Sequence, residues 1–401
     1  MKPVNASQLL TLEVAPWSRL VTTCVAHMTE HLYVGIITVV LPVMATALGM
    51  NMAQAGILVS SRSLAAGLSN LPSGLLADLI NRRSLLLGVS LIVLGLSSLL
   101  MSFAPNYWVL LAFMVLGAVG AGSFHPQSLT ILSTAYRDRR ALALGVHDSS
   151  GNFGEVIAPL TIGTLLTFID WRSTLQIWAV PGVAVGLLYA LFCSEIGATA
   201  SSSRASFKRA LWHDVITNRA VLALFLISVF RAMGQMSLLA FLPLYLTLDL
   251  KLPVGAMGFY ISLLFFFGGI APSLSGYFSD RIGRAPLMIW GSALSAAAIA
   301  VLPSLSQGIA LGLGCAAVGT LLWALRPVIF AAAMEAAPAE MGGSLVGFIY
   351  TGNMGLSFIA PIVAGFIADA YGLAAALSLI GVFPLLACFV ALSSLRRSAS
   401  T

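Results

Sequence analysis

Long apolar stretches recur along the whole chain, and short segments rich in polar residues or glycine separate them. A helix needs about 20 apolar residues to cross the ~30 Å hydrocarbon core of a bilayer. Twelve stretches meet this length, so the pattern predicts twelve transmembrane helices, six in each half. We expect these helices at 17–45, 53–78, 84–103, 107–134, 140–168, 173–194, 220–247, 254–279, 285–304, 307–333, 342–369 and 372–393.

The two halves carry the same landmarks at a nearly constant offset. His125-Pro126 is followed by Gly-Asn-Phe-Gly at 151–154. At an offset of 201 residues, Arg326-Pro327 is followed in the same way by Gly-Asn-Met-Gly at 352–355. The segments GLLADLINRR and GYFSDRIGRA start 202 residues apart, at 74 and 276. Parallel copies of this kind are typical of transporters whose halves are related by an axis along the membrane normal.

The sequence therefore predicts an all-α integral membrane protein with two pseudo-symmetric six-helix halves. We place the halves at residues 1–195 and 219–401, and the polar, basic segment 196–218 is expected to be a cytoplasmic linker.

Composition supports a lipid environment. Of the 401 residues, 59% are hydrophobic and 8% are charged, and the mean hydropathy is +0.98, whereas soluble proteins average about 25% charged residues. These values exclude a soluble enzyme. The chain contains no nucleotide-binding loop and no metal-ligand cluster on one helical turn, so we expect no enzymatic activity, no cofactor and no metal, and transport energy drawn from a gradient. The four cysteines lie in different spans and predict no disulfide.

Basic residues predict the orientation. With both termini in the cytoplasm, fifteen of the 20 Lys and Arg residues fall on the cytoplasmic side, where such residues accumulate. Because these charges are spread over separate short loops, we expect no nucleic-acid partner. No cleavable signal precedes the first span, which is therefore expected to direct insertion into a bacterial inner membrane.

The loop after the second helix of each half resembles the loop motif of the major facilitator superfamily. In that family the aspartate and the basic residues form a cytoplasmic latch, which implies a gating role for Asp78, Arg82, Arg83, Asp280, Arg281 and Arg284. The first copy departs from the motif at Leu79 and Asn81, which implies a weaker latch. The alternative is that Asp78 and Asp280 only cap helix ends.

The fifth span resembles the helix motif of drug:proton antiporters of the same superfamily. Gly145, Gly154, Pro159 and Gly163 match that motif, and Ala158 replaces a glycine. Small residues allow close helix approach, and the proline bends the helix. The resemblance implies a proton-driven exporter, and generic packing is the alternative.

Three segments of the first half resemble the fosmidomycin resistance branch of the superfamily. They are His-Met-Thr-Glu at 27–30, GAGSFHPQS from 120 and GNFGEVIAP from 151. Members of this branch export a small phosphonate antibiotic, which implies an anionic or amphiphilic substrate.

Ionisable residues inside the spans are the candidate site residues, because an isolated charge at the bilayer centre costs roughly 2.5–3.5 kcal/mol and such groups usually face a cavity or a partner. The first helix of each three-helix repeat carries at least one. We predict substrate contacts from Arg326, Arg231, His125, Gln235 and Tyr33, proton coupling by Glu30, His27, His31, Asp148 and Glu155, and an outer-gate role for Arg62.

Each candidate has a structural alternative. Glu30 lies one turn from His27 and is expected either to carry a proton or to pair permanently with an arginine. Arg326 is expected either to bind an anion through its guanidinium fork or to bridge to Glu30 or Glu155. Arg231 suits anion contact and internal pairing equally.

The sequence thus predicts a monomeric carrier that exports a small anionic or amphiphilic compound in exchange for protons by alternating access. The alternatives are uptake or uniport of a small anionic metabolite, and a receptor or lipid-handling protein that does not cycle solutes. Substrate identity, direction and stoichiometry are left open.

Overall fold

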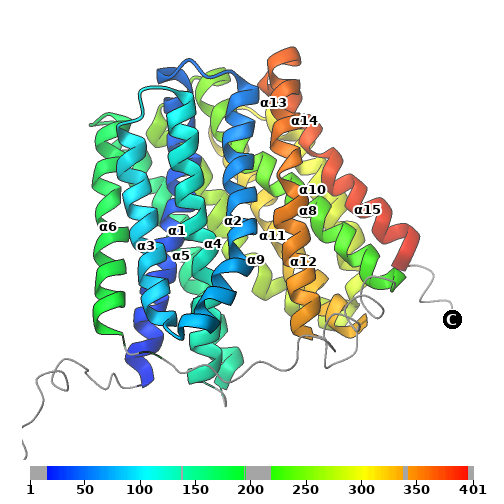
Figure 1. Ribbon diagram of the computed structural model, residues 1–401. Coiled ribbons are helices and arrows are strands. Elements are labelled where there is room, and N and C mark those ends of the chain that lie inside the picture. The colour runs from blue at the N-terminus through cyan, green and yellow to red at the C-terminus, as the bar shows by residue number, and fades with distance from the viewer. Residues whose placement is uncertain (1–15, 137–138, 194, 196–217, 337–341, 396–401) are drawn as a thin grey trace, which may run out of the picture. The chain divides into compact units, whose positions relative to one another are not determined.

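The computed structural model describes residues 16–136, 139–193, 195, 218–336 and 342–395 (Figure 1). These residues are almost entirely helical. The helices are α1 (Pro16–Ala47), α2 (Met52–Ile80), α3 (Arg83–Ser102), α4 (Tyr107–Ala135), α5 (Arg140–Leu165), α6 (Trp171–Phe192), α8 (Arg219–Leu244), the π-helix η4 (Tyr245–Asp249), α9 (Val254–Ile282), α10 (Arg284–Val301), the 3-10 helix η5 (Leu302–Ser304), α11 (Ile309–Ala336), α12 (Gly342–Ser357), α13 (Ile359–Tyr371), α14 (Leu373–Ile380) and α15 (Val382–Leu395).

Every predicted span coincides with a helix or with a pair of consecutive helices, which confirms the all-α membrane fold. Among the described residues, ten segments are long and apolar enough to cross a membrane. The two remaining predicted spans correspond to α2 and α5, which are 29 and 26 residues long. Two spans are interrupted, at Phe358 between α12 and α13 and at Gly381 between α14 and α15.

Polar caps and residues with positive φ set the helix ends. The side chains of Asn106, Asp170 and Asn218 accept hydrogen bonds from the first N–H groups of α4, α6 and α8, groups that have no partner within the helix. Asn81, with φ of 52°, separates α2 from α3, and Gly283, with φ of 92°, separates α9 from α10. Asparagine tolerates this left-handed conformation better than most residues, so Asn81 replaces the glycine of the second copy.

The helices form two compact units. Unit 1 comprises Met1–Met44 and Leu64–Ala200, and unit 2 comprises Ala45–Ser63 and Ser201–Thr401. The start of α2 therefore belongs to unit 2 and the rest of α2 to unit 1. The predicted linker 196–218 lies outside the described residues except for Asn218.

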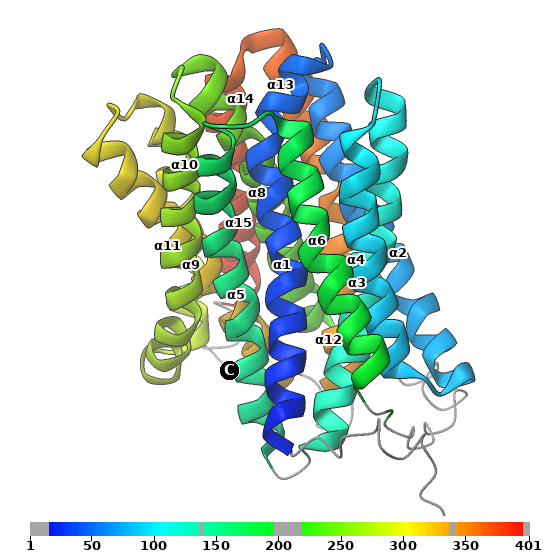
Figure 2. The same ribbon diagram turned by 90° about the vertical axis from the view of Figure 1, so that its left-hand side faces the viewer.

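In unit 1, α3 packs against α4 and α6, and α1 lies beside α5 and α6 (Figure 2). Glycines bring these helices close together. A Cβ atom on Gly88 of α3 would lie 2.6 Å from the carbonyl oxygen of Gly186 in α6, and one on Gly154 of α5 would collide with the carbonyl oxygen of Met28 in α1. The unit is therefore assembled on small residues, as membrane helix interfaces commonly are.

In unit 2, α9 packs against α11, and α15 packs against α8 and α10. The start of α2 joins this unit by packing on α13. A Cβ atom on Gly365 of α13 would lie 2.5 Å from the carbonyl oxygen of Met52, and one on Gly56 would collide with the carbonyl oxygen of Pro361.

Large apolar side chains are exposed on outward helix faces in both units. Leu191 of α6 is 71% exposed, Trp290 of α10 is 67% exposed and Phe366 of α13 is 60% exposed. Extensive exposed apolar surface of this kind is expected where helices face lipid.

Candidate functional site

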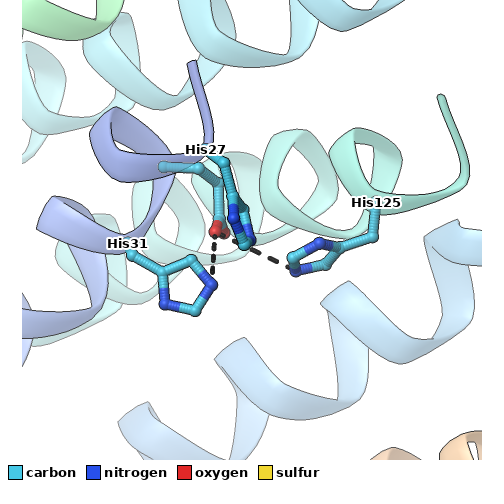
Figure 3. A group of neighbouring side chains, drawn as sticks. His27, His31 and His125 are labelled. Atoms are coloured by element: carbon cyan, nitrogen blue, oxygen red, sulfur yellow. Dashed lines mark ion pairs between the residues drawn. The ribbon is translucent and has the colours of Figure 1, made fainter. Parts of the chain in front are cut away.

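A cluster of polar side chains lies inside unit 1, where α1 faces α4. His27, Glu30 and His31 lie within about one turn of α1, and His125 precedes Pro126 in α4. Glu30 Oε2 is 3.5 Å from His31 Nε2 and 3.9 Å from His125 Nε2. Figure 3 shows the rings of His27, His31 and His125 converging, and one donor atom from each of the four residues lies within 4.8 Å of the others. We call these four residues the polar cluster.

Two neighbours on α5 orient the histidine rings. His27 Nδ1 lies 2.7 Å from the backbone carbonyl oxygen of His147, and His31 Nδ1 lies 3.0 Å from Glu155 Oε1. A carbonyl oxygen can only accept, so Nδ1 of His27 donates, and Nε2 carries the lone pair of the neutral ring. A carboxylate at Glu155 fixes the same tautomer in His31.

Packing holds the rings in place. The His27 ring stacks on the His147 ring, with centroids 3.8 Å apart, and it is parallel to the Phe124 ring, whose centroid is 5.8 Å away. A Cβ atom on Gly151 would lie 2.6 Å from His27 Cε1 and 2.9 Å from His31 Cδ2. The glycine at the start of the Gly-Asn-Phe-Gly segment therefore leaves the space that both rings occupy.

Burial is uneven across the polar cluster. The Glu30 side chain is 4% exposed, whereas that of His125 is 40% exposed. In the described part of the chain, Glu30 Oε2 accepts no hydrogen bond, although it is buried. A buried carboxylate oxygen of this kind requires a cation or a donor.

The polar cluster differs in one contact from the sequence prediction. His27 makes its hydrogen bond with the carbonyl of His147 and not with Glu30, which instead lies near His31 and His125. The sequence predicted no metal, and the structure brings three donor residues of α1 and one of α4 close enough to hold an ion. Asp148, the neighbour of His147, has an exposed side chain.

The expectation of a substrate contact from Tyr33 does not fit the structure. Tyr33 is 4% exposed, and its hydroxyl donates to the carbonyl oxygen of Trp178 at 2.6 Å and accepts from the backbone N–H of Gly182 at 3.0 Å. The hydroxyl thus donates one hydrogen bond to α6 and accepts another from it.

Unit 2 contains an arginine pair in place of the polar cluster. Arg231 of α8 is 4% exposed and donates to Gln235 Oε1 at 2.6 Å, while its Nε has no hydrogen-bond partner among the described residues. Arg326 of α11 is half-buried, and its positive charge acts on Arg231. No ion pair joins Arg231 to an acid in the described residues. Two interacting guanidinium groups inside the membrane therefore have the chemistry of an anion site.

Polar contacts hold the loop between α2 and α3, where the sequence predicted the latch. Asp78 forms an ion pair with Arg83, and Arg83 Nη1 donates to Gln127 Oε1 of α4 at 3.1 Å. Glu195 was not predicted, and it accepts from the backbone N–H groups of Ser84 and Leu85 at 2.9 and 3.0 Å. Its position after a helix offered no periodicity by which to find it.

The corresponding loop of unit 2 also carries an ion pair between an aspartate and an arginine. Arg284 Nη1 lies 2.6 Å from Asp280 Oδ1, and Arg284 Nη2 lies 3.0 Å from Glu335 Oε1 at the end of α11. The guanidinium of Arg281 instead lies over the Tyr277 ring, 4.2 Å from its centroid. Arg82, the first-half counterpart of Arg284 within its motif, is exposed.

The remaining gating candidates are spread along α2 and α5. Arg62 is half-buried in the part of α2 that belongs to unit 2. Pro159 lies within α5 opposite Gly35 of α1, where a Cβ atom would be 3.2 Å from the proline ring. Gly145 was predicted to allow close helix approach, but it is exposed and a Cβ atom there would meet nothing within 4 Å.

Comparison with known proteins places the chain among transporters. The sequence model of the Major Facilitator Superfamily matches residues 23–361 and 224–401. An uncharacterised MFS-type transporter of Bacillus subtilis (strain 168), YfnC, is 25% identical over 373 residues, covering 90% of this chain and 89% of the relative. The fosmidomycin resistance protein of Escherichia coli (strain K12) is 23% identical over 352 residues, covering 86% of this chain and 84% of the relative.

Solved structures agree on the fold. A bacterial homologue of the human lysosomal transporter Spinster, in an inward-facing and unoccupied conformation, has a TM-score of 0.80 at 17% identity and covers 95% of this chain and 97% of its own. The nucleoside transporter NupG has a TM-score of 0.81 at 14% identity, covering 94% of this chain and 99% of its own. At these identities the likeness concerns the fold alone.

Proposed function

Because the chain belongs to the Major Facilitator Superfamily, we propose that it is a secondary transporter that exports a small anionic or amphiphilic compound in exchange for protons. Export is supported by relatives named for drug resistance, among them the fosmidomycin resistance protein and the multidrug resistance protein MdtG of Proteus mirabilis (strain HI4320), which is 25% identical over 308 residues and covers 75% of each chain.

The arginine pair of unit 2 is the observation that supports an anionic substrate. Arg231 is buried, is oriented by Gln235 and interacts electrostatically with Arg326. Two positive charges repel each other in a medium of low dielectric constant, so an anion that contacts both stabilises them. The planar guanidinium fork binds phosphonate, phosphate or carboxylate oxygens in pairs.

The polar cluster of unit 1 supports coupling to a cation. It contains one buried carboxylate surrounded by imidazole nitrogens, and Glu155 extends it toward α5. The antiporter-like motif of α5 and the resistance proteins among the relatives favour the proton as the driving ion.

We assign the protein to the bacterial inner membrane with both termini in the cytoplasm, on the distribution of Lys and Arg along the chain. In this orientation the pairs Asp78–Arg83 and Asp280–Arg284 are cytoplasmic. They are the latch that we propose to break and re-form in each transport cycle.

Purified protein in liposomes that enclose a pH-sensitive dye tests this proposal. An inward proton gradient is imposed, and a panel of phosphonates, organic anions and amphiphilic drugs is added. We expect proton flux that depends on anionic or amphiphilic members of the panel. Substrate movement without proton flux would leave a uniporter or a carrier coupled to another ion, and movement of solute with protons would indicate uptake. If no solute moves, the non-cycling alternatives are favoured.

The arginine pair is tested by Arg326→Ala. Loss of a charged hydrogen bond of about 1.5–3 kcal/mol predicts roughly a 10- to 100-fold loss of transport efficiency for an anion. Arg326→Lys retains the charge without the fork and is expected to be intermediate. Arg219→Ala, at an exposed residue that begins α8, is the matched control. If Arg326→Ala lowers thermal stability and leaves the transport of folded protein unchanged, the arginine is a structural bridge.

A further inference from the structure

We propose that His27, Glu30, His31 and His125 together bind one divalent transition-metal ion of the zinc class. One donor atom from each residue lies within 4.8 Å of the others (Figure 3). Around a tetrahedral ion with bonds of about 2.0–2.1 Å, donor atoms lie roughly 3.3 Å apart. Glu30 Oε2 lies 3.5 Å from His31 Nε2 and 3.9 Å from His125 Nε2, so small side-chain movements close the polar cluster around an ion.

The surroundings of the cluster are those of a metal site. Histidine ligands of metals usually donate their second ring nitrogen to a carbonyl or carboxylate oxygen, which fixes the ring and the tautomer. His27 makes this contact with the carbonyl oxygen of His147 at 2.7 Å, and His31 makes it with Glu155 at 3.0 Å. In each ring Nε2 is then the nitrogen that carries a lone pair.

The charges also favour a cation at this place. The Glu30 carboxylate is buried in a membrane helix, and its Oε2 accepts no hydrogen bond from the described residues. His31 Nε2 lies 3.5 Å from this oxygen, so the carboxylate is neutralised by a proton on the imidazole or by a metal ion bound between the two atoms. When the imidazole is neutral, an ion bound by both atoms supplies the missing positive charge.

The ligand atoms of the polar cluster determine which metal ions it can bind. Three imidazoles and one carboxylate suit zinc, cobalt, nickel or copper, whereas magnesium and calcium require mostly oxygen ligands. His125 offers a route of entry because 40% of its side chain is exposed, whereas Glu30 is almost fully buried. The proposed function places the coupling cation at the same polar cluster. Metal binding is inferred from the geometry of the cluster alone, and only a role of the metal in transport rests on the proposed function.

Metal binding is measured on the full-length protein in detergent, without transport, after cleavage of any affinity tag and removal of metal with a chelator. Titration with Zn²⁺ by calorimetry is expected to give one ion per chain, and Co²⁺ is expected to give the visible absorption of a tetrahedral site. Glu30→Gln and His125→Ala should each weaken binding at least tenfold. Glu155→Gln, which removes an orienting contact and no ligand, should weaken it by about 10- to 100-fold.

Glu335→Gln is the matched control, because it makes the same substitution in unit 2 and should bind metal as the wild type does. Glu30→Asp retains the carboxylate and should restore part of the affinity, which separates loss of a ligand from misfolding. The proposal is overturned if the wild type takes up no ion, or if the folded double variant of Glu30→Gln and His125→Ala binds Zn²⁺ with unchanged affinity. Metal binding without any solute transport would count against the proposed function alone.

Discussion

The Tyr33 hydroxyl of α1 bonds to the backbone of α6 beside a proline that lies within that helix. Pro181 supplies no N–H group to α6. Next to it, the Tyr33 hydroxyl donates to the carbonyl of Trp178 and accepts from the N–H of Gly182, two groups that are four residues apart. These are the partners of an ordinary helical hydrogen bond, so the hydroxyl is inserted into the ladder of α6 and ties α1 to it.

Tyr33→Phe removes this inserted hydroxyl and leaves two buried backbone groups without it. We expect the free energy of unfolding to fall by about 1–3 kcal/mol, with the KM of transport unchanged. Thermal unfolding in detergent and transport in liposomes measure the two effects. Tyr350→Phe, at a side chain that is 45% exposed, is the control and should change stability little. A raised KM at unchanged stability would instead indicate that Tyr33 contacts the substrate, as the sequence predicted.

The sequence predicted the members of the polar cluster better than their contacts. Glu30, His27 and His125 stand out individually, because ionisable groups inside apolar spans are costly. His31 points about 100° away from Glu30 on an ideal helix, and only the approach of α5 explains its contact with Glu155 at 3.0 Å. The approach of His125 to Glu30 could not be predicted for the same reason, since it depends on how α1 packs against α4.

At the scale of elements, glycine spacing decides how closely α1 and α5 approach. A Cβ atom on Gly154 would collide with the backbone of Met28, and one on Gly151 would push against two histidine rings. The predicted role of small residues in α5 fits Gly154, whereas Gly151 was not among the predicted positions. That role does not apply to Gly145, which is exposed and has open space around it.

Gly154→Ala and Gly145→Ala form a matched pair in one helix. Gly154→Ala forces α1 and α5 apart, and we expect a loss of about 1–3 kcal/mol in the free energy of unfolding. Gly145→Ala meets no neighbour, and alanine favours a helix over glycine by up to about 1 kcal/mol, so stability should be unchanged or higher. Thermal unfolding of both variants tests this, and equal destabilisation would show that backbone freedom and not packing is responsible.

Helix positions could be predicted because membrane thickness sets the length of every span. Interruptions within spans could not. Pro159 lies inside the continuous helix α5, whereas its counterpart Pro361 follows a break at Phe358 between α12 and α13. A proline removes one hydrogen bond in both copies, and the packing of each unit decides whether the helix continues.

At the scale of the whole molecule, the internal repeat provides two similar frameworks with opposite chemistry. The paired positions His125 and Arg326 both precede a proline within a helix. The paired aspartates Asp78 and Asp280 each form an ion pair with an arginine at the start of the following helix, although Arg83 and Arg284 are not at matching positions. Histidines around a carboxylate occupy unit 1, while interacting arginines occupy unit 2. In the proposed function, one copy of the repeated framework binds the cation and the other binds the anion.

Asp369 joins elements that the repeat alone does not connect. Its carboxylate accepts from the N–H groups of Met52 and Ala53 at 2.8 and 2.9 Å, so α13 caps α2, a helix that continues into unit 1.

Asp369→Ala should lower the free energy of unfolding by about 0.5–2 kcal/mol and change the transport rate, because alternating access requires the units to move. Asp170→Ala is the control. Bonds from Ser173 hold the pKa of the Asp170 carboxyl below its usual range, so this cap is charged at neutral pH, but it serves only α6. Asp170→Ala should lower stability without altering the transport rate. If both variants transport at the same rate, Asp369 is only a structural cap.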